Sequence, residues 1–181
     1  MRWVVAAGAW GFAEATLFFI VPDVLLTWIA AFRPARTLPA IGACLLGALL
    51  GGALMFTAAT RDPAGTRQLV ERVPAIGTEL VDRTGRGLDA SYPRQMLVGG
   101  LSGVPYKVLA IEAASEDGSL VKFLGWSVPA RLPRWLALAF LARTVAQVAR
   151  GRFRNADRGL VATWAVAWSL VYAVYFTVMK G

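Results

Sequence analysis

Five charged residues that could do chemistry lie inside otherwise apolar stretches of the chain: Glu14, Asp23, Lys107, Arg131 and Arg134. Ionisable groups at membrane depth are costly, and where they occur they usually serve a function. A carboxyl group there can exchange a proton or bind a cation, so we predict this role for Glu14 and Asp23. A lysine or a forked guanidinium suits a phosphate, so we predict that the three bases contact an anionic substrate.

Each of these residues also has an ordinary structural interpretation. Asp23 would cap the helix that follows it, and Glu14 would form a buried salt bridge. Lys107 would neutralise Asp23, while Arg131 and Arg134 would extend toward lipid headgroups from one face of a helix. The residue types alone do not choose between the chemical and the structural roles.

Two apolar segments with a break in the middle carry the acids and the lysine. The first covers residues 4–32 and breaks at Pro22, and the second covers residues 97–115 and breaks at Pro105. Proline removes a backbone donor and disfavours helix at the residue before it. Each half-helix of roughly ten residues spans only about 15 Å, half of a bilayer core of about 30 Å. We therefore predict two re-entrant hairpins; a single kinked crossing is the alternative for the first.

The other elements are predicted from composition and periodicity. The chain is 57% hydrophobic with a mean hydropathy of +0.55, which favours a membrane protein. Uncharged spans cover residues 37–59 and 159–179, and the second carries an aromatic stripe that suggests packing and interface anchoring. The stripe consists of Trp164, Trp168, Tyr172 and Tyr175. In the first span Ala43, Gly47 and Gly51 favour close helix packing, which also offers a contact for a homo-oligomer.

Two further segments complete the single domain predicted for residues 1–181. Residues 63–91 form an amphipathic helix kinked at Pro74, lying on the membrane surface or packed on the protein. Residues 119–149 exceed one untilted crossing and are expected to break at Pro129 and Pro133. The predicted fold is therefore an all-α integral membrane protein. It has two opposed re-entrant hairpins, about three to four membrane helices and an amphipathic surface helix.

The arginine-rich loop Arg150–Arg158 is the strongest orientation signal, because positively charged loops stay in the cytoplasm. We therefore predict a multi-pass protein of the cell (inner) membrane with this loop inside. Following the chain back from this loop, the first broken segment enters from the cytoplasm and the second from the opposite face. Opposed broken helices are typical of the inverted repeats of transporters.

The sequence lacks the residues that several other function classes require. The chain has no histidine, so Ser102 in the string Gly-Leu-Ser-Gly has no usual base, and we predict no enzyme and no catalytic residue. We expect no metal site and no cofactor. The net charge of +8 comes mostly from arginines beside apolar segments, which anchor helices, so we expect no nucleic-acid partner.

Three short strings, in this order, resemble the DedA family, also called SNARE-associated or VTT-domain proteins, and in particular its YqaA-like branch. They are Glu14 followed by Pro22-Asp23-Val24-Leu25-Leu26, then Val104-Pro105-Tyr106-Lys107-Val108, then Arg131-Leu132-Pro133-Arg134-Trp135. The resemblance implies two opposed re-entrant loops, a bacterial inner membrane and movement of lipids or lipid-linked phosphates. It places Glu14 and Asp23 at acidic family positions and Lys107 where many members carry arginine. Residues 97–103 depart from other branches, which have an earlier arginine there.

The predicted function is therefore a DedA-like transporter that moves lipid or lipid-linked phosphate with proton or cation coupling. Membrane lipids, and protons or cations, are its expected partners. The alternative is a non-transporting membrane scaffold or lipid-organising protein, for which the helix at 63–91 would matter more than Glu14.

Overall fold

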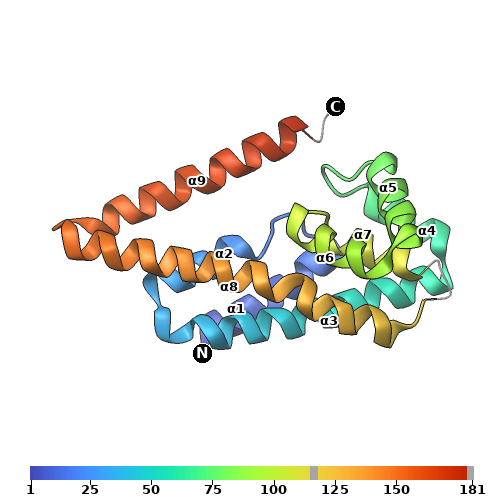
Figure 1. The fold of residues 1–181 in the computed structure, drawn as a ribbon, viewed down its shortest axis with the longest axis horizontal. Helices are drawn as coiled ribbons and strands as arrows, with labels where there is room; N and C mark the ends of the chain where they lie inside the picture. Colours follow the sequence, from blue (N-terminus) through green and yellow to red (C-terminus); the bar gives the residue numbers. More distant parts are fainter. Residues whose placement is uncertain (115–117, 179–181) are drawn as a thin grey trace.

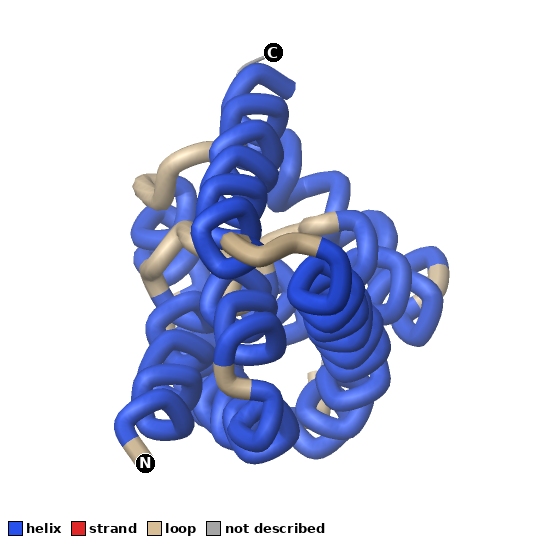
Figure 2. The backbone as a smooth tube through the Cα atoms, turned by 90° about the vertical axis from the view of Figure 1, so that its left-hand side faces the viewer, coloured by secondary structure: helices blue, strands red, loops and turns tan. Residues whose placement is uncertain are grey.

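A computed structural model describes residues 1–114 and 118–178 of the chain (Figure 1), and every regular element in these ranges is a helix. The elements are α1 (Arg2–Thr16), α2 (Asp23–Phe32), a 3₁₀ turn (Pro34–Arg36), α3 (Thr37–Arg61), α4 (Pro63–Glu71), α5 (Thr78–Ala90), α6 (Tyr92–Ser102), α7 (Tyr106–Ala114), α8 (Leu120–Arg152) and α9 (Ala156–Val178). Figure 2, seen from the end that holds the α8–α9 connection, shows these helices and their short loops. The all-α prediction is confirmed for the described residues.

Two helical stretches of the described chain are long and apolar enough to cross a membrane. They are Pro34–Arg61, with a mean hydropathy of 2.0, and Ala156–Thr177, with a mean hydropathy of 1.6. The two uncharged spans predicted from the sequence fall on these stretches, except that residue 179 lies outside the described residues. α3 runs along the lower edge of the view and packs against α1, α7 and α8, whereas α9 runs from its connection with α8 away from the other helices (Figure 1). Only 6% of the most apolar part of α9 is buried in the protein, which favours an apolar environment around this helix.

Small residues join α1 to α3 at close range. A Cβ atom added to Gly11 or Gly47 would lie within 3.0 Å of backbone atoms of the other helix, and one added to Gly51 would meet α1 equally closely. Small residues allow such an approach because no side chain separates the two backbones. The predicted stripe of Ala43, Gly47 and Gly51 is therefore used inside the chain. A second chain could reach it only by displacing α1.

Both predicted breaks occur. The first interrupts the chain between Thr16 and Asp23, and the second lies between α6 and α7, where Gly103 has a φ of +90°. Glycine suits this position because left-handed backbone carries no Cβ penalty there. On either side of the breaks, α2 and α6 pack against α8, while α1 and α7 pack against α3. The broken segments are thus held between the two longest helices.

The predicted break of the 119–149 segment is wrong. α8 runs without interruption from Leu120 to Arg152 with Pro129 and Pro133 inside it. A proline removes one hydrogen bond and kinks a helix, but it does not have to end it. Here the turns around the prolines are held by packing, because Ala130, Arg131 and Trp135 are buried against other helices.

The predicted single helix over residues 63–91 is also wrong, since α4 and α5 are separate helices. α4 ends at Glu71, and the turn that joins it to α5 contains Pro74 and then Ala75, which has a left-handed φ of 68°. The apolar side of this unit is buried in the chain, including Val70, Val81 and Leu88. Its contacts with α6 and α7 match the interpretation of a helix packed on the protein rather than one lying on a membrane surface.

We expect Gly47→Ala to lower the free energy of unfolding by about 1–3 kcal/mol, because overpacking a tight contact forces backbone shifts. The new methyl group would meet the carbonyl oxygen of Gly8 on α1. The matched control is Gly42→Ala on the same helix, where no atom lies within 4 Å of the added Cβ. Alanine is a better helix former than glycine by about 1 kcal/mol, so this control should be neutral or stabilising. Unfolding in detergent micelles, followed by circular dichroism, measures both; equal effects would contradict the α1–α3 contact.

Candidate functional site at the two helix breaks

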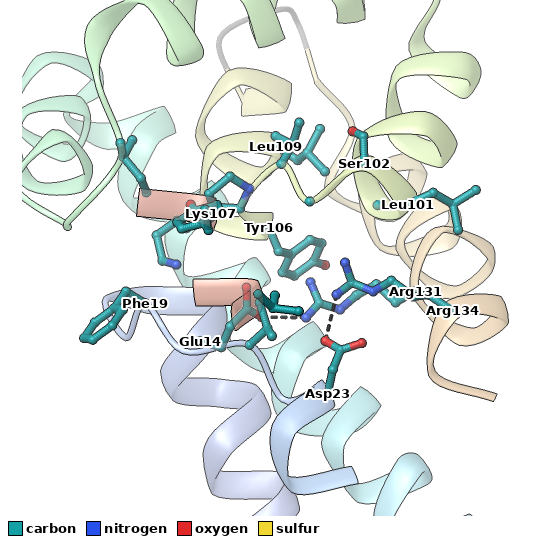
Figure 3. A pocket seen from close by; sticks show the side chains of 18 of the residues that line it. Glu14, Phe19, Asp23, Leu101, Ser102, Tyr106, Lys107, Leu109, Arg131 and Arg134 are labelled. Carbon is teal, nitrogen blue, oxygen red and sulfur yellow. Dashed lines mark hydrogen bonds and ion pairs between the residues drawn. The ribbon is translucent and has the colours of Figure 1, made fainter. Parts of the chain in front are cut away.

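A cavity of about 520 Å³ lies where the two breaks meet (Figure 3). Its lining includes the five charged residues singled out in the sequence: Glu14, Asp23, Lys107, Arg131 and Arg134. The first break contributes Phe19 and Val21, the second contributes residues 103–105, and the turn between α4 and α5 contributes Val73, Pro74 and Ile76. Of the two predicted break prolines, Pro105 lines the cavity, whereas Pro22 does not, although its neighbours Val21 and Asp23 do. The structure therefore brings the five predicted charged residues to one cavity.

The first ion pair joins Glu14 on α1 to Arg131 on α8. Arg131 Nη2 donates to Glu14 Oε2 at 2.5 Å, and neither side chain is more than 7% exposed. The guanidinium also lies over the ring of Tyr106 at 4.3 Å and over that of Trp135 at 4.8 Å. Such cation–π contacts stabilise a buried guanidinium on the sides where no carboxylate contacts it. This pair is enclosed on several sides.

Tyr106 is itself held in place, which fixes the ring beneath Arg131. Its hydroxyl donates to Ser127 Oγ at 2.7 Å, and its ring stacks on Phe123 with centroids 5.3 Å apart. Gly52 of α3 leaves room for this ring, because a Cβ there would lie 2.6 Å from its Cε1 atom. The position of Arg131 therefore depends on α3, α7 and α8 together.

The second ion pair joins Asp23 to Arg134 and is less completely satisfied. Arg134 Nη2 donates to Asp23 Oδ2 at 2.9 Å, with side-chain exposures of 23% for the arginine and 2% for the aspartate. Asp23 Oδ1 and Arg134 Nε are buried without a hydrogen-bond partner among the described residues, whereas in the first pair this holds for Arg131 Nε alone. The expectation that Asp23 caps a helix from Val24 is wrong, because α2 begins at Asp23 itself and its N-terminus has no side-chain cap bond. The carboxylate is turned to Arg134 instead (Figure 3).

Lys107 connects the two breaks directly. Its Nζ donates to the carbonyl oxygen of Phe18 at 3.2 Å, and the residue is only 1% exposed. Within residues 1–114 and 118–178 it forms no ion pair, so the alternative in which it neutralises Asp23 is not realised. A lysine satisfies a carbonyl left free where α1 ends, in the way that cations stabilise helix C-termini.

Aromatic residues satisfy two backbone groups of the first break, a role that sequence reasoning missed. Tyr172 accepts a hydrogen bond from the Val21 amide at 2.8 Å, and Trp10 donates to the Ile20 carbonyl at 3.0 Å. Trp164 and Trp168 both donate to Thr27 Oγ1 at 3.1 Å, and this hydroxyl donates to the carbonyl of Asp23. The stripe on α9 thus holds α2 and the first break in place. The polar ends of these aromatic side chains were the available signal.

The cavity carries more positive than negative charge. Three bases face two carboxylates, which leaves a formal charge of +1, while Leu138, Val171 and Val174 add apolar walls. A cavity of this kind suits an anion with an apolar portion. In the described part of the chain no cluster of three or more His, Cys, Asp or Glu residues could hold a metal ion.

Compared with known proteins, the chain matches no protein-family model, no curated protein and no solved structure. The DedA resemblance therefore rests on the three strings and remains a prediction. What the fold and the site define is a class: an all-helical chain, with two helices able to cross a membrane, around a buried ionic cluster at two helix breaks.

We expect Arg131→Met and Glu14→Leu each to lower the free energy of unfolding by about 3–5 kcal/mol, because each leaves a buried charge without its partner. The double variant removes both charges, so its loss should be smaller than that of either single variant. Unfolding in detergent, analysed as a double-mutant cycle, tests this coupling. Simply additive losses would show that the two side chains do not depend on each other.

Proposed function

We propose that the chain is a DedA-like membrane transporter that moves lipid or lipid-linked phosphate, coupled to a proton or cation. The convergence of two carboxylates and three bases in one cavity at the meeting point of two helix breaks carries this proposal. Non-helical backbone inside a membrane is tolerated where it is packed in protein or lines a cavity, and transporters build their sites from such broken helices.

The course of the chain supports opposed re-entrant hairpins. In Figure 1 both ends of the first broken segment lie toward the end that holds the α8–α9 connection. Both ends of the second lie toward the opposite end, near α4 and α5. We propose that each segment enters the membrane and returns to the same face, with the Arg150–Arg158 loop in the cytoplasm of a bacterial cell. The described chain would then present its two breaks to each other near mid-depth.

The surplus positive charge gives the expected substrate class. A phosphate would neutralise the charge of the cavity, and Lys107 and Arg134 both line it. The apolar residues of α8 and α9 that complete the walls suit the hydrocarbon part of a lipid or a polyprenyl phosphate. We propose that the anion binds to the bases while the apolar chain extends along α9.

The two ion pairs differ in a way that suggests the coupling step. Arg131 is enclosed by two rings and Glu14, whereas Arg134 is partly exposed and leaves one oxygen of Asp23 without a partner. We propose that the substrate anion replaces Asp23 at Arg134, and that the released carboxylate then takes up a proton. Glu14 keeps Arg131 in position and holds the second acidic site for a proton or cation. Ionisable groups facing Asp23 are Glu14 from α1, Cys44 from α3, Arg131 and Arg134 from α8 and Tyr172 from α9.

In liposomes, we expect the full chain to move a fluorescent anionic phospholipid between leaflets faster when a pH gradient is applied. Lys107→Ala and Arg134→Ala should each reduce the rate at least tenfold, because each removes a cation that faces the phosphate. The control is Arg143→Ala, which should leave the rate unchanged. Arg143 is an exposed arginine of α8, the helix that carries Arg134, and it lies outside the cavity. Rates equal to those of empty liposomes would overturn the transport proposal. If the protein still organised lipid domains in that case, a scaffold function would be favoured.

The exchange of Asp23 predicts a gain of binding. Asp23→Asn removes the competing carboxylate, and a charge-assisted hydrogen bond contributes about 1.5–3 kcal/mol, so affinity for a short-chain anionic phospholipid should rise about tenfold at neutral pH. In the unaltered protein, binding should strengthen as pH falls, because protonation of Asp23 frees Arg134. This pH dependence should be weaker in Asp23→Asn. Titration calorimetry in detergent measures both; weaker binding by Asp23→Asn would mean that the aspartate supports the anion site instead of competing for it.

A further inference from the structure

The connection between α8 and α9 forms a second pocket of about 350 Å³. The α8–α9 connection faces the viewer in Figure 2, and the pocket shares no lining residue with the cavity at the breaks. Residues 150 and 153–158 line it, and they include three arginines: Arg150, Arg154 and Arg158. The proposed transporter site does not involve any of them.

One of these arginines is already fixed by the protein. Arg150 Nε donates to Asp157 Oδ1 at 2.9 Å, and its Nη1 donates to the carbonyl of Ala31 at 2.9 Å. Its guanidinium also lies 5.6 Å from the ring centroid of Phe32 at the end of α2. Arg154 and Arg158, by contrast, form no ion pair within the described residues. The pocket therefore pairs one fixed guanidinium with two whose hydrogen bonds remain for a ligand.

The charge of this end differs from that of the opposite end. Residues 33–36 and 150–158 carry six arginines and one aspartate, a net charge of +5. Residues 61–94 carry six arginines but five acids, a net charge of +1, and Arg67 is held there by both Glu71 and Asp82. Arginines at the opposite end are thus balanced by the chain itself, whereas those at the α8–α9 connection are not. The surplus indicates an anionic partner for the arginine pocket.

Phe153 gives the nature of that partner. This large apolar side chain lines the same pocket and is 64% exposed. It lies next to the start of α9, which is one of the two stretches apolar enough to cross a membrane. A free anion gains nothing from an exposed phenyl ring, whereas a lipid brings hydrocarbon to it directly beside its phosphate.

We propose that the pocket at the α8–α9 connection binds the headgroup phosphate of an anionic membrane lipid. Arg154 and Arg158 donate to the phosphate oxygens, and Phe153 contacts the first part of the acyl chains. Basic pockets beside membrane helices bind anionic headgroups in this way. The connection that forms this pocket joins α8, which carries Arg131 and Arg134, to α9, which lines the cavity at the breaks. A lipid bound in the pocket would hold this connection at the anionic leaflet.

The test uses the full chain in phosphatidylcholine vesicles that contain a small fraction of spin-labelled phosphatidylglycerol or, in parallel, spin-labelled phosphatidylcholine. Electron paramagnetic resonance measures the immobilised fraction of each lipid. We expect a several-fold preference for phosphatidylglycerol that weakens as salt increases. The double variant Arg154→Gln/Arg158→Gln should lose this preference. The control Arg83→Gln/Arg86→Gln, two exposed arginines of α5 with the same change of charge, should keep it.

Each result decides the proposal. Equal losses in both double variants would overturn it in favour of non-specific attraction to total charge. Displacement of the labelled lipid by millimolar inorganic phosphate, with no effect of Phe153→Ala, would show a site for free phosphate instead. All of these positions are exposed, so the variants should fold, and circular dichroism verifies this. Transport can fail while the lipid preference persists, which separates this inference from the proposed function.

Discussion

The rest of the structure depends on the pairing of Arg131 with Glu14. A guanidinium buried as deeply as that of Arg131 costs several kcal/mol unless a carboxylate and further contacts compensate it. The partner comes from α1, more than a hundred residues earlier, so α1 must end close to the middle of α8. The tyrosine ring that covers Arg131 comes from the start of α7, so the second break must lie there as well. One buried charge therefore requires both breaks to meet.

A meeting of two breaks creates a second requirement, because the backbone groups of a broken helix need partners. Water provides them in soluble proteins, but an apolar environment does not. Lys107, beside the second break, donates to the carbonyl of Phe18 in the first break. Tyr172 accepts a hydrogen bond from the amide of Val21 in the first break. These partners come from α7 and α9, so the elements that surround the cavity also stabilise the irregular chain that forms it. Trp10, which donates to the Ile20 carbonyl, has the same structural role.

The prolines made the two breaks predictable, and the charges in apolar surroundings made the five site residues predictable. Pairing was not predictable, because Arg131 and Arg134 lie on one helix face and either could have met either acid. The continuity of α8 through Pro129 and Pro133 was missed for a similar reason: local preference for a break was outweighed by burial of the turns between them. The apolar face of α5 could have met lipid or protein, and only the position of α6 and α7 decides this.

The unequal enclosure of the two ion pairs follows from these positions. Arg131 occupies the turn of α8 that faces the closely packed α1 and α3, where aromatic rings fill the space around it. Arg134 lies about one turn further along, where it meets Asp23 at the start of α2 and, among the described residues, has no aromatic ring over its guanidinium. Both arginines line the cavity, but the side chain of Arg134 is 23% exposed and that of Arg131 only 7%. This difference in exposure comes from what surrounds each arginine, and in the proposed transport cycle it makes Arg134, rather than Arg131, the arginine that the ligand reaches.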